Sequence, residues 1–567
     1  MEKVYGKTSG LKASQLKRLQ NMYRRKASPH EIISHDLARQ LSNISMEIKR
    51  QVGLLVTRKG DMAQVIVGDN RRIWIPDLSR YRKGPGRLKG VRMIHTHLNG
   101  EALSEEDITD LVLLGLDLMV CIQVDERGIP GPISYAHILP KNHRGQGWSI
   151  TKVPDIGRLA VDFQEMIRSL EDELAKSNGS SLVEGVPADR AVLVSVTTGS
   201  PWKARESLEE LRELALSNEL EVVDVVFQRI KKAAPGFLIG RGKLSELALR
   251  CLQAGSNLLI FDNELTPAQV KALTDHTDLK IIDRSQLILD IFARRAVTRE
   301  GKIQVELAQL KYLLPRLATK NTAMSRLTGG IGGRGPGETK LEINRRRVRE
   351  RIARLNKELK KIKEQREDRR KLRNSRGLPV ISIVGYANAG KSTLLNNLTL
   401  SNVGVRDRFF ETLDPSSRRL RFPREREAII TDTVGFIRDL PKDLFEAFAA
   451  TLEELRDADL LLHVVDASSP RMEEQIGAVD LILEKLNLLQ VPTLLVLNKC
   501  DLIGRRKATR YAQRLSGVAI SAIHQETFSP LLHRIEQGIW PGSTSPGTSR
   551  GFHFWQSRGP RTARSSQ

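Results

Sequence analysis

Residues 380–392 read Val-Ile-Ser-Ile-Val-Gly-Tyr-Ala-Asn-Ala-Gly-Lys-Ser, and this stretch decides the fold that we expect for the C-terminal part of the chain. Residues 380–384 predict a buried strand and a helical pattern begins at Thr393, so a glycine-containing loop links a strand to a helix. Backbone N–H groups of such a loop face phosphates, Lys391 places a positive charge near the β- and γ-phosphates, and Ser392 offers its hydroxyl to magnesium. We therefore expect an α/β P-loop domain with a doubly wound, mostly parallel sheet. By itself the motif suits an ATPase as well as a GTPase.

The choice of base is predicted by Asn498-Lys499-Cys500-Asp501, which follows an apolar strand pattern. The Asp501 carboxylate can accept hydrogen bonds from the ring N–H and the exocyclic amino group of guanine, whereas adenine offers no matching pair of donors. We expect Asn498 to tie neighbouring loops together and the stem of Lys499 to cover the face of the base. Ser521-Ala522-Ile523 stands where a further base-contacting loop is expected.

Two further strings complete the predicted site. Asp432 begins Asp-Thr-Val-Gly at a strand end, where it can hold the water shell of magnesium while the Gly435 N–H reaches the γ-phosphate. Thr412 is the candidate switch threonine, which completes the magnesium shell only when the third phosphate is present. We assign catalytic roles to Lys391, Thr412 and Gly435, and magnesium ligation to Ser392 and Thr412. The expected nucleotide-contacting residues are Gly385, Tyr386, Ala387, Asn388, Ala389, Gly390, Lys391, Ser392, Phe410, Glu411, Thr412, Leu413, Asp414, Asp432, Thr433, Val434, Gly435, Asn498, Lys499, Cys500, Asp501, Ser521, Ala522 and Ile523.

The residue after Gly435 is Phe436, at a position where small signalling GTPases use a glutamine that orients the attacking water. A phenyl ring cannot align water. We therefore hypothesise slow intrinsic hydrolysis that a partner accelerates.

Composition bounds the rest of the chain. Its 567 residues include 91 Lys and Arg against 67 Asp and Glu, a net charge of +24, which predicts a polyanionic partner such as nucleic acid. Three cysteines lack disulfide or metal-ligand spacing, which is typical of a reducing compartment, and we expect a cytoplasmic protein. The most apolar run, residues 111–124, is short and contains Asp117, so we expect no membrane insertion.

Two segments before the nucleotide motifs share the 4,3 spacing of a helix with a narrow apolar seam. Ile303, Leu307, Leu310, Leu314 and Leu317 form the first seam, and Val348, Ile352, Leu355, Leu359 and Ile362 form the second. The spacing predicts an antiparallel helical hairpin whose link contains a glycine-rich string at residues 329–337. Residues 340–376 hold 17 Lys and Arg against six Asp and Glu, and this one-sided charge favours a surface that contacts a polyanion over a solvated face.

The N-terminal half shows two α/β patterns. Residues 44–136 predict a small unit with strand patterns that include residues 72–75 and a helix over residues 105–116. Alternating strand and helix patterns over residues 192–282 predict a second, mostly parallel sheet. Gly240-Arg241-Gly242-Lys243 in this region favours a tight turn over a second phosphate cradle.

These motifs, together with residues 236–243 (GFLIGRGK) and 329–340 (GGIGGRGPGETK), resemble the HflX family of translational GTPases over residues 186–541. The resemblance implies a family-specific α/β domain at 186–300, a basic helical hairpin with a glycine-rich tip at 301–376 and a GTPase domain at 377–541. An N-terminal extension (residues 1–185) and a basic tail (residues 542–567), expected to be disordered, lie outside it.

The same resemblance implies a function and partners. The protein would hydrolyse GTP to GDP, bind the large ribosomal subunit and its RNA through the basic hairpin, and act in ribosome splitting, rescue or biogenesis. We expect a monomer with Mg²⁺ as cofactor. The alternative is an RNA-binding scaffold whose nucleotide site is only regulatory.

The N-terminal extension carries one more pattern. His95-Thr96-His97 at a strand end, followed by Ser104 and Asp107, resembles the metal site of JAB/MPN-type metalloproteases, in which two imidazoles and a carboxylate bind zinc and Glu47 is a conceivable base. Leu98 replaces the usual proline, and the spacing from His97 to Ser104 is one residue short. The pattern favours a strand-end histidine pair with Ser104 as helix N-cap, or a degenerate JAB/MPN-like domain at residues 1–185 that is used for binding, over a working zinc site.

Overall fold

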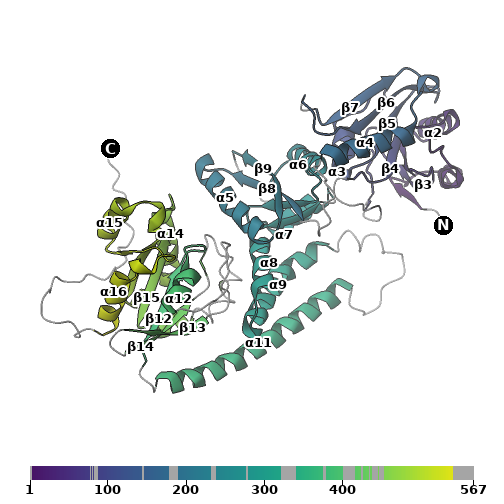
Figure 1. Ribbon diagram of the computed structural model, residues 1–567. Coiled ribbons are helices and arrows are strands. Elements are labelled where there is room, and N and C mark those ends of the chain that lie inside the picture. The colour runs from purple at the N-terminus through teal and green to yellow at the C-terminus, as the bar shows by residue number, and fades with distance from the viewer. Residues whose placement is uncertain are drawn as a thin grey trace, which may run out of the picture. The chain divides into compact units, whose positions relative to one another are not determined.

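The computed structural model describes residues 3–76, 78, 81, 87–143, 146–177, 189–231, 238–275, 277, 279–320, 340–374, 378–399, 416–422, 426–432, 435–436, 445 and 453–540. The chain divides into two compact units, Met1–Arg284 and Ser285–Gln567 (Figure 1). The basic tail and the glycine-rich string of the hairpin lie outside the described residues. Among those residues, no helix combines the length and the hydropathy that crossing a membrane requires.

The first unit begins with a mixed seven-stranded sheet of order β1-β3-β2-β4-β5-β6-β7. Strand β4 pairs in parallel with β5 and antiparallel with β2. The strands are β1 (Val4–Gly6), β2 (Val52–Thr57), β3 (Met62–Val67), β4 (Val91–His97), β5 (Leu118–Val124), β6 (Pro130–Ile138) and β7 (Trp148–Val153), and the helices are α1 (Ala13–Asn21), α2 (His35–Ile48), α3 (Glu105–Leu114) and α4 (Phe163–Ser177).

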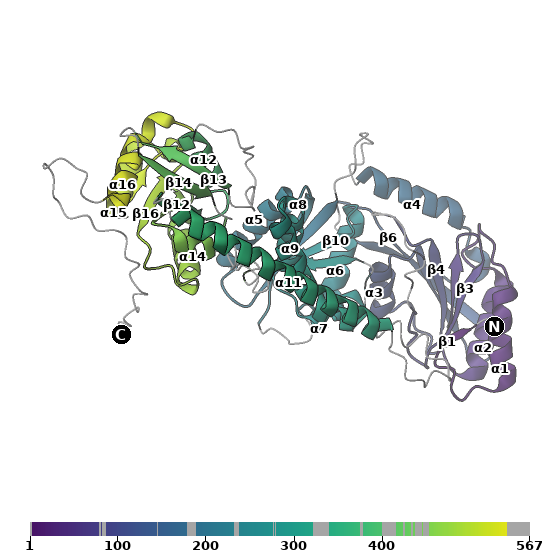
Figure 2. The ribbon, with the colours of Figure 1, turned by 90° about the horizontal axis from the view of Figure 1, so that it is seen from below.

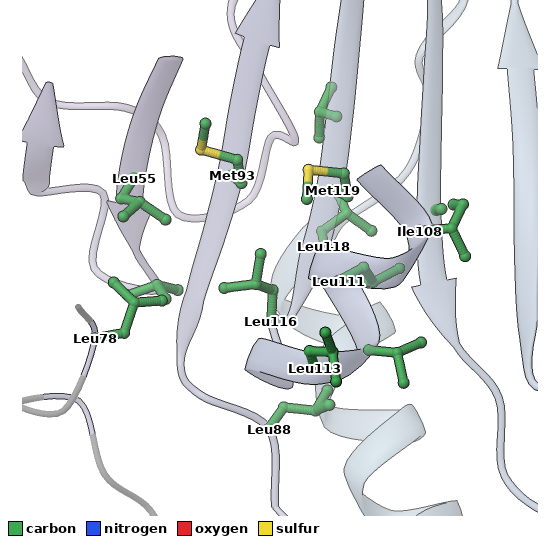
Figure 3. Packing of buried hydrophobic residues seen from close by; sticks show 14 of the residues in the cluster. Leu55, Leu78, Leu88, Met93, Ile108, Leu111, Leu113, Leu116, Leu118 and Met119 are labelled. Carbon is green, nitrogen blue, oxygen red and sulfur yellow. The ribbon is translucent and has the colours of Figure 1, made fainter. Parts of the chain in front are cut away.

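Helix α3 lies against β5 and supplies part of the core of this sheet. Figure 3 shows Ile108 and Leu111 of the helix beside Leu118 and Met119 of the strand, and all four side chains are buried. The side chain of Ser104 accepts a hydrogen bond from the Asp107 N–H, and the Asp107 side chain caps the Ser104 N–H in return. This capping box confirms the N-cap that the sequence predicts. The helix ends two residues earlier than expected because Gly115 takes a left-handed conformation with φ +62°.

The strand predicted over residues 72–75 is wrong. The Asp69 carboxylate accepts hydrogen bonds from the backbone N–H groups of Arg71 and Arg72, and the Asp69 N–H donates to the Arg72 carbonyl oxygen, so the chain turns there. Pro76 follows and has no N–H for a sheet. The sequence patterns also missed β1, β6, β7, α1, α2 and α4.

A four-stranded sheet of order β11-β10-β8-β9 completes the first unit, and all of its strand pairs are parallel, as the alternating pattern predicts. Helices α3 and α6 lie side by side between the two sheets (Figures 1 and 2). Gly240 is the N-cap of α6, and Lys243 pairs with Glu246 within that helix, which supports the tight turn rather than a phosphate cradle. The elements are β8 (Arg190–Thr197), α5 (Pro201–Ser217), β9 (Glu221–Arg229), α6 (Arg241–Gln253), β10 (Leu258–Phe261), α7 (Pro267–Thr274) and β11 (Lys280–Asp283). Helix α8 (Arg284–Arg295) follows and begins the second unit.

The basic hairpin (residues 301–376) consists of α9 (Arg299–Lys320) and α11 (Lys340–Asn374). Ile303, Leu307 and Leu355 are buried between the helices, with Ile352 and Leu359 packed around them. Arg351 pairs with Glu306, and Arg299 pairs with Glu358, so contacts run in opposite directions along the two helices. The predicted antiparallel hairpin and its apolar seams are confirmed for these residues.

The second sheet system has the order β13-β14-β12-β15-β16-β17, and only the edge pair β13–β14 is antiparallel. This confirms the expected doubly wound, mostly parallel fold. Parallel strands place their carboxyl ends at one edge, where Gly385, Asp432 and Asn498 all stand. The elements are β12 (Val380–Gly385), α12 (Lys391–Thr399), β13 (Ser416–Arg421), β14 (Glu427–Asp432), β15 (Leu460–Asp466), α14 (Met472–Lys485), β16 (Thr493–Asn498), α15 (Arg505–Arg514), β17 (Val518–Ala519) and α16 (Ser529–Ile539).

Candidate functional site: a guanine-nucleotide pocket at the strand ends

The loop between β12 and α12 has a backbone conformation that requires glycine at two positions. A Cβ atom on Gly385 would lie 2.1 Å from the Val464 carbonyl oxygen of the neighbouring strand. Gly390 has φ +87°, and a Cβ there would lie 2.3 Å from Nδ2 of Asn498. Asn388 also adopts a left-handed conformation, with φ +62°, which asparagine tolerates better than most residues. These conformations let the loop turn tightly into the start of α12, the geometry in which a phosphate-binding loop presents its backbone to a ligand.

Lys391 begins α12 and is buried, with Nζ donating a hydrogen bond of 2.9 Å to the Tyr386 carbonyl oxygen. Burial lowers the pKa of Lys391 to about 8, while the charge of Asp432 acts in the opposite direction. Phosphate oxygens would supply the negative charge that stabilises the ammonium form. A polyanionic ligand would therefore interact favourably with the buried Lys391 ammonium group.

This pKa predicts a pH dependence of nucleotide binding. Because the bound triphosphate raises the pKa again, binding must take up a proton once the free protein has lost it above about pH 8. We expect the affinity for a non-hydrolysable GTP analogue to fall roughly tenfold between pH 7 and pH 9. Calorimetric titration at pH 8.5 in two buffers of different protonation enthalpy measures the proton uptake, after correction for titration of the guanine ring in the free analogue. Proton release, or none, contradicts the expectation.

Ser392, a predicted magnesium ligand, and Asp432, predicted to hold the water shell of the ion, come together, whereas the second predicted ligand, Thr412, lies outside the described residues. Oγ of Ser392 donates a hydrogen bond of 2.7 Å to Oδ2 of Asp432, which lies at the end of β14. A hydroxyl beside a buried carboxylate is the oxygen-donor set that Mg²⁺ prefers. The two residues therefore fit a magnesium ion held by the Ser392 hydroxyl, with Asp432 on its water shell.

Gly435 and Phe436 lie against the phosphate loop. The Ala387 N–H donates to the Phe436 carbonyl oxygen at 2.6 Å, and the Phe436 N–H donates to the Gly385 carbonyl oxygen at 3.0 Å. A Cβ on Gly435 would lie 3.0 Å from both the Ala387 Cα and the Lys391 Nζ, so only glycine fits there without displacing the lysine. The Phe436 side chain is buried, and no polar atom of it is available to hold water.

Asn498 connects the phosphate loop to the loop of residues 521–523. Its Nδ2 donates 2.8 Å to the Ala389 carbonyl oxygen of the phosphate loop, and its Oδ1 accepts 2.8 Å from the Ala522 N–H. Lys499 has φ +61°, and its Nζ lies 2.9 Å from Oδ2 of Asp466, which holds the lysine stem in place. Asp501 is exposed, in position to receive a ligand from solvent.

Cys500 and residues 521–523 complete the part of the predicted site that the structure describes. The Cys500 N–H donates to the Ile520 carbonyl oxygen, and burial raises the pKa of its thiol to about 11, so the thiol stays neutral. Ser521 and Ala522 are buried, whereas Ile523 is exposed. The residues predicted for the switch region and part of the following loop lie outside the described residues: Phe410, Glu411, Thr412, Leu413, Asp414, Thr433 and Val434.

Sequence reasoning missed Asp466, the partner of Lys499. Asp466 is the last residue of β15, and the sheet register places it beside Asn498. The available signal was a carboxylate that ends the apolar run of residues 460–465. An acidic side chain at a parallel strand end next to a base-recognition loop could have been included on that ground.

Comparisons with known proteins bear on this site and on the hairpin. Three family models match the chain: GTP-binding GTPase N-terminal at residues 205–293, GTP-binding GTPase Middle Region at 295–373 and 50S ribosome-binding GTPase at 380–499. GTPase HflX of Caldanaerobacter subterraneus is 50% identical over 315 residues, which cover 56% of this chain and 73% of that protein. The chain belongs to the HflX family of GTPases.

Other HflX proteins give the same picture. GTPase HflX of Lacrimispora saccharolytica is 44% identical over 61% of this chain and 82% of its own length, and GTPase HflX of Escherichia coli is 45% identical over 56% of this chain and 74% of its own length. This HflX-family protein is therefore a GTPase that binds GTP and GDP, as the motifs predict. The N-terminal extension precedes the first residue that the family models match.

The basic hairpin coincides with the middle-region match and presents a charged face. Arg347, Arg349, Arg354, Lys357, Lys360 and Lys361 of α11 are exposed, and none of them has an ion-pair partner among the described residues. Their cationic groups lie on one helix of 35 residues. Mutual pairing within the helix therefore does not account for this charge.

In the N-terminal extension, the structure does not support Glu47 as a catalytic base. Glu47, considered above as a base, hydrogen-bonds to Gln15 and pairs with Arg18 on α1. Its carboxylate is thus engaged on the surface between α1 and α2. The extension offers no support for the catalytic interpretation at this residue.

Proposed function

We propose that this HflX-family GTPase binds the large ribosomal subunit through the exposed basic face of α11 and acts there in splitting, rescue or biogenesis of ribosomes. The observation that carries the proposal is the set of six exposed Lys and Arg side chains on α11 that have no ion-pair partner within the described part of the chain. Ribosomal RNA is a polyanion that such a face would bind, with release of counterions. The matching model of 50S ribosome-binding GTPases favours the ribosome over other polyanions.

The nucleotide state would control this association. The third phosphate would add contacts to Lys391 and Gly435, and the neighbouring Phe436 is hydrogen-bonded to the phosphate loop. Loss of that phosphate would release these contacts, so the GTP form favours binding and hydrolysis permits departure. Because Phe436 cannot orient water, we propose that the ribosome completes the hydrolytic site. Binding to ribosomes would also place the protein in the cytoplasm.

Sedimentation with ribosomal subunits tests the proposal. The chain should co-sediment with the large subunit in a non-hydrolysable GTP analogue and far less in GDP or without nucleotide. Replacement of Lys357, Lys360 and Lys361 by Ala should weaken binding and reduce the slope of log affinity against log salt by roughly two to three.

A charge-matched control distinguishes a specific contribution of the α11 surface from a general effect of net charge. The control residues are Lys17 of α1, Lys485 of α14 and Lys141 in the connection between β6 and β7. All three are exposed, and their replacement by Ala removes the same charge. If this control weakens binding as much as the α11 triple variant, the hairpin is not the contact surface. Association that is equal in all three nucleotide states contradicts the switch.

A further inference from the structure

His95 and His97 bring their side chains together at the end of β4. Residues two apart in a strand share one face of the sheet, and the two Nε2 atoms lie 3.0 Å apart. Both side chains are buried, at 0% and 4% exposure. Thr96 between them faces the other way and hydrogen-bonds to Ser45 Oγ. The two imidazoles are therefore held together on one buried face of the sheet.

Two further potential ligands reach the same place. The parallel register of β4 and β5 puts Cys121 opposite His95, and its Sγ lies within 4.8 Å of the ligand atoms of both histidines. From α3, Oδ1 of Asp107 lies 3.3 Å from His95 Nε2, and Oδ2 lies 3.6 Å from His97 Nε2. A thiol, a carboxylate and two imidazoles from three elements thus converge, although Cys121 was missed in the sequence because 23 residues separate it from the His97 end of the motif.

The surroundings orient these groups toward one another. His97 Nδ1 lies 3.2 Å from the Glu101 carbonyl oxygen, a contact that places the ring proton on Nδ1 and leaves the Nε2 lone pair facing His95. Oδ2 of Asp107 accepts hydrogen bonds from the N–H and the hydroxyl of Ser104, which fixes the carboxylate with Oδ1 toward the histidines. Carbonyl and hydroxyl groups that hold ligand side chains in this manner are typical of metal sites.

The hydrogen bond between the two imidazoles, the Asp107 cap on Ser104 and the 3.7 Å contact of Cys121 Sγ with the Glu101 carbonyl oxygen each involve one part of the cluster. None of these contacts draws the four donor groups together. His95 Nδ1 is buried and has no hydrogen-bond partner among the residues that the structure describes. Burial of a thiol, a carboxylate and two imidazoles in one place costs free energy. A bound cation would offset that cost by coordinating the converging donor atoms.

We propose that His95, His97, Asp107 and Cys121 bind one Zn²⁺ in a closed structural site. Two nitrogens, a sulfur and an oxygen form a donor set that suits zinc, whose bonds to them are about 2.0–2.3 Å long. Small side-chain movements of Asp107 and Cys121 would bring all four donors to that distance. With four protein ligands no position remains for a substrate or a reactive water, so the ion joins β4, β5 and α3 rather than hydrolysing a bond.

Metal analysis of the full-length chain, purified without chelator and without a histidine tag, tests the proposal. We expect about one zinc ion per chain. The variants His95→Ala and His97→Ala should each lose zinc affinity by more than about 100-fold, whereas His143→Ala, which removes an exposed histidine of the same extension, should keep it. A wild-type chain that neither retains zinc nor takes it up stoichiometrically overturns the proposal, and this outcome does not depend on any variant.

Cobalt substitution tests the four-ligand set itself. The cobalt-loaded wild-type chain should show a thiolate-to-cobalt charge-transfer band in the near ultraviolet and strong visible bands of tetrahedral cobalt. Cys121→Ser should abolish the first and retain the second. Guanine-nucleotide binding by each variant serves as the check that the remainder of the chain is folded. A wild-type spectrum without the sulfur band overturns the closed site, because cobalt would then have an open position.

Discussion

Replacement of Lys391 by Ala is expected to reduce GTP hydrolysis by about 10²- to 10³-fold, because it removes the buried charge that stabilises the phosphates in the transition state. The affinity for GTP should fall by about 10- to 100-fold, as a charge-assisted hydrogen bond is lost. Single-turnover hydrolysis and equilibrium binding of a fluorescent GTP analogue measure the two effects. The variant should fold, because Lys391 donates only to one carbonyl oxygen in the nucleotide-free site.

Lys485→Ala is the matched control, since Lys485 is an exposed lysine of α14 in the same unit. It should leave both quantities unchanged. The Lys391 variant also separates the switch from the RNA-binding scaffold. A scaffold would still bind the large subunit as the wild type does, whereas a switch would lose the difference between the GTP and GDP states. Association of the Lys391 variant as strong as that of the wild type, and equal with GTP, with GDP and without nucleotide, contradicts the proposed switch.

Replacement of Asp501 by Asn should change the base that the site accepts. The carboxylate would accept two hydrogen bonds from guanine, and an amide can accept only one of them while its NH₂ group opposes the other donor. We expect GTP affinity to fall by about 10³-fold. Xanthosine triphosphate, which carries a carbonyl oxygen in place of the exocyclic amino group, should bind the variant better than GTP does. Competition binding with both nucleotides measures the reversal.

Because Asp501 is exposed, this substitution should change the free energy of unfolding by less than about 0.5 kcal/mol. Glu526→Gln removes one charge from an exposed carboxylate near the loop of Ser521 and should leave the base preference as it is. Equal losses for GTP and xanthosine triphosphate in the Asn variant contradict base recognition by Asp501.

Much of the nucleotide site could be predicted because its motifs are local. The string ending in Lys391 and Ser392 carries its own strand, loop and helix signals, and the apolar runs before Asp432 and Asn498 mark strand ends. A doubly wound sheet brings such ends to one edge whatever the intervening sequence is. The seam of the basic hairpin was predictable for a similar reason, since its spacing repeats along each helix.

Other features could not be predicted because they depend on contacts between distant residues. The turn at Asp69 replaced a predicted strand because a side chain takes the backbone N–H groups that a sheet would need. Asp466 lies beside Asn498 and pairs with Lys499 only because of the register between β15 and β16. The family resemblance covers none of the N-terminal extension, so its sheet order came from the structure alone.

The sequence by itself determined that this chain is a guanine-nucleotide-binding α/β protein with a basic helical hairpin, because short motifs and helical periodicity encode those properties locally. Only the tertiary structure decided which two loops Asn498 joins, that Phe436 is buried, and that Cys121 converges on His95, His97 and Asp107. Each of these depends on strand register and on helices packing against sheets, which bring together side chains that no sequence spacing relates.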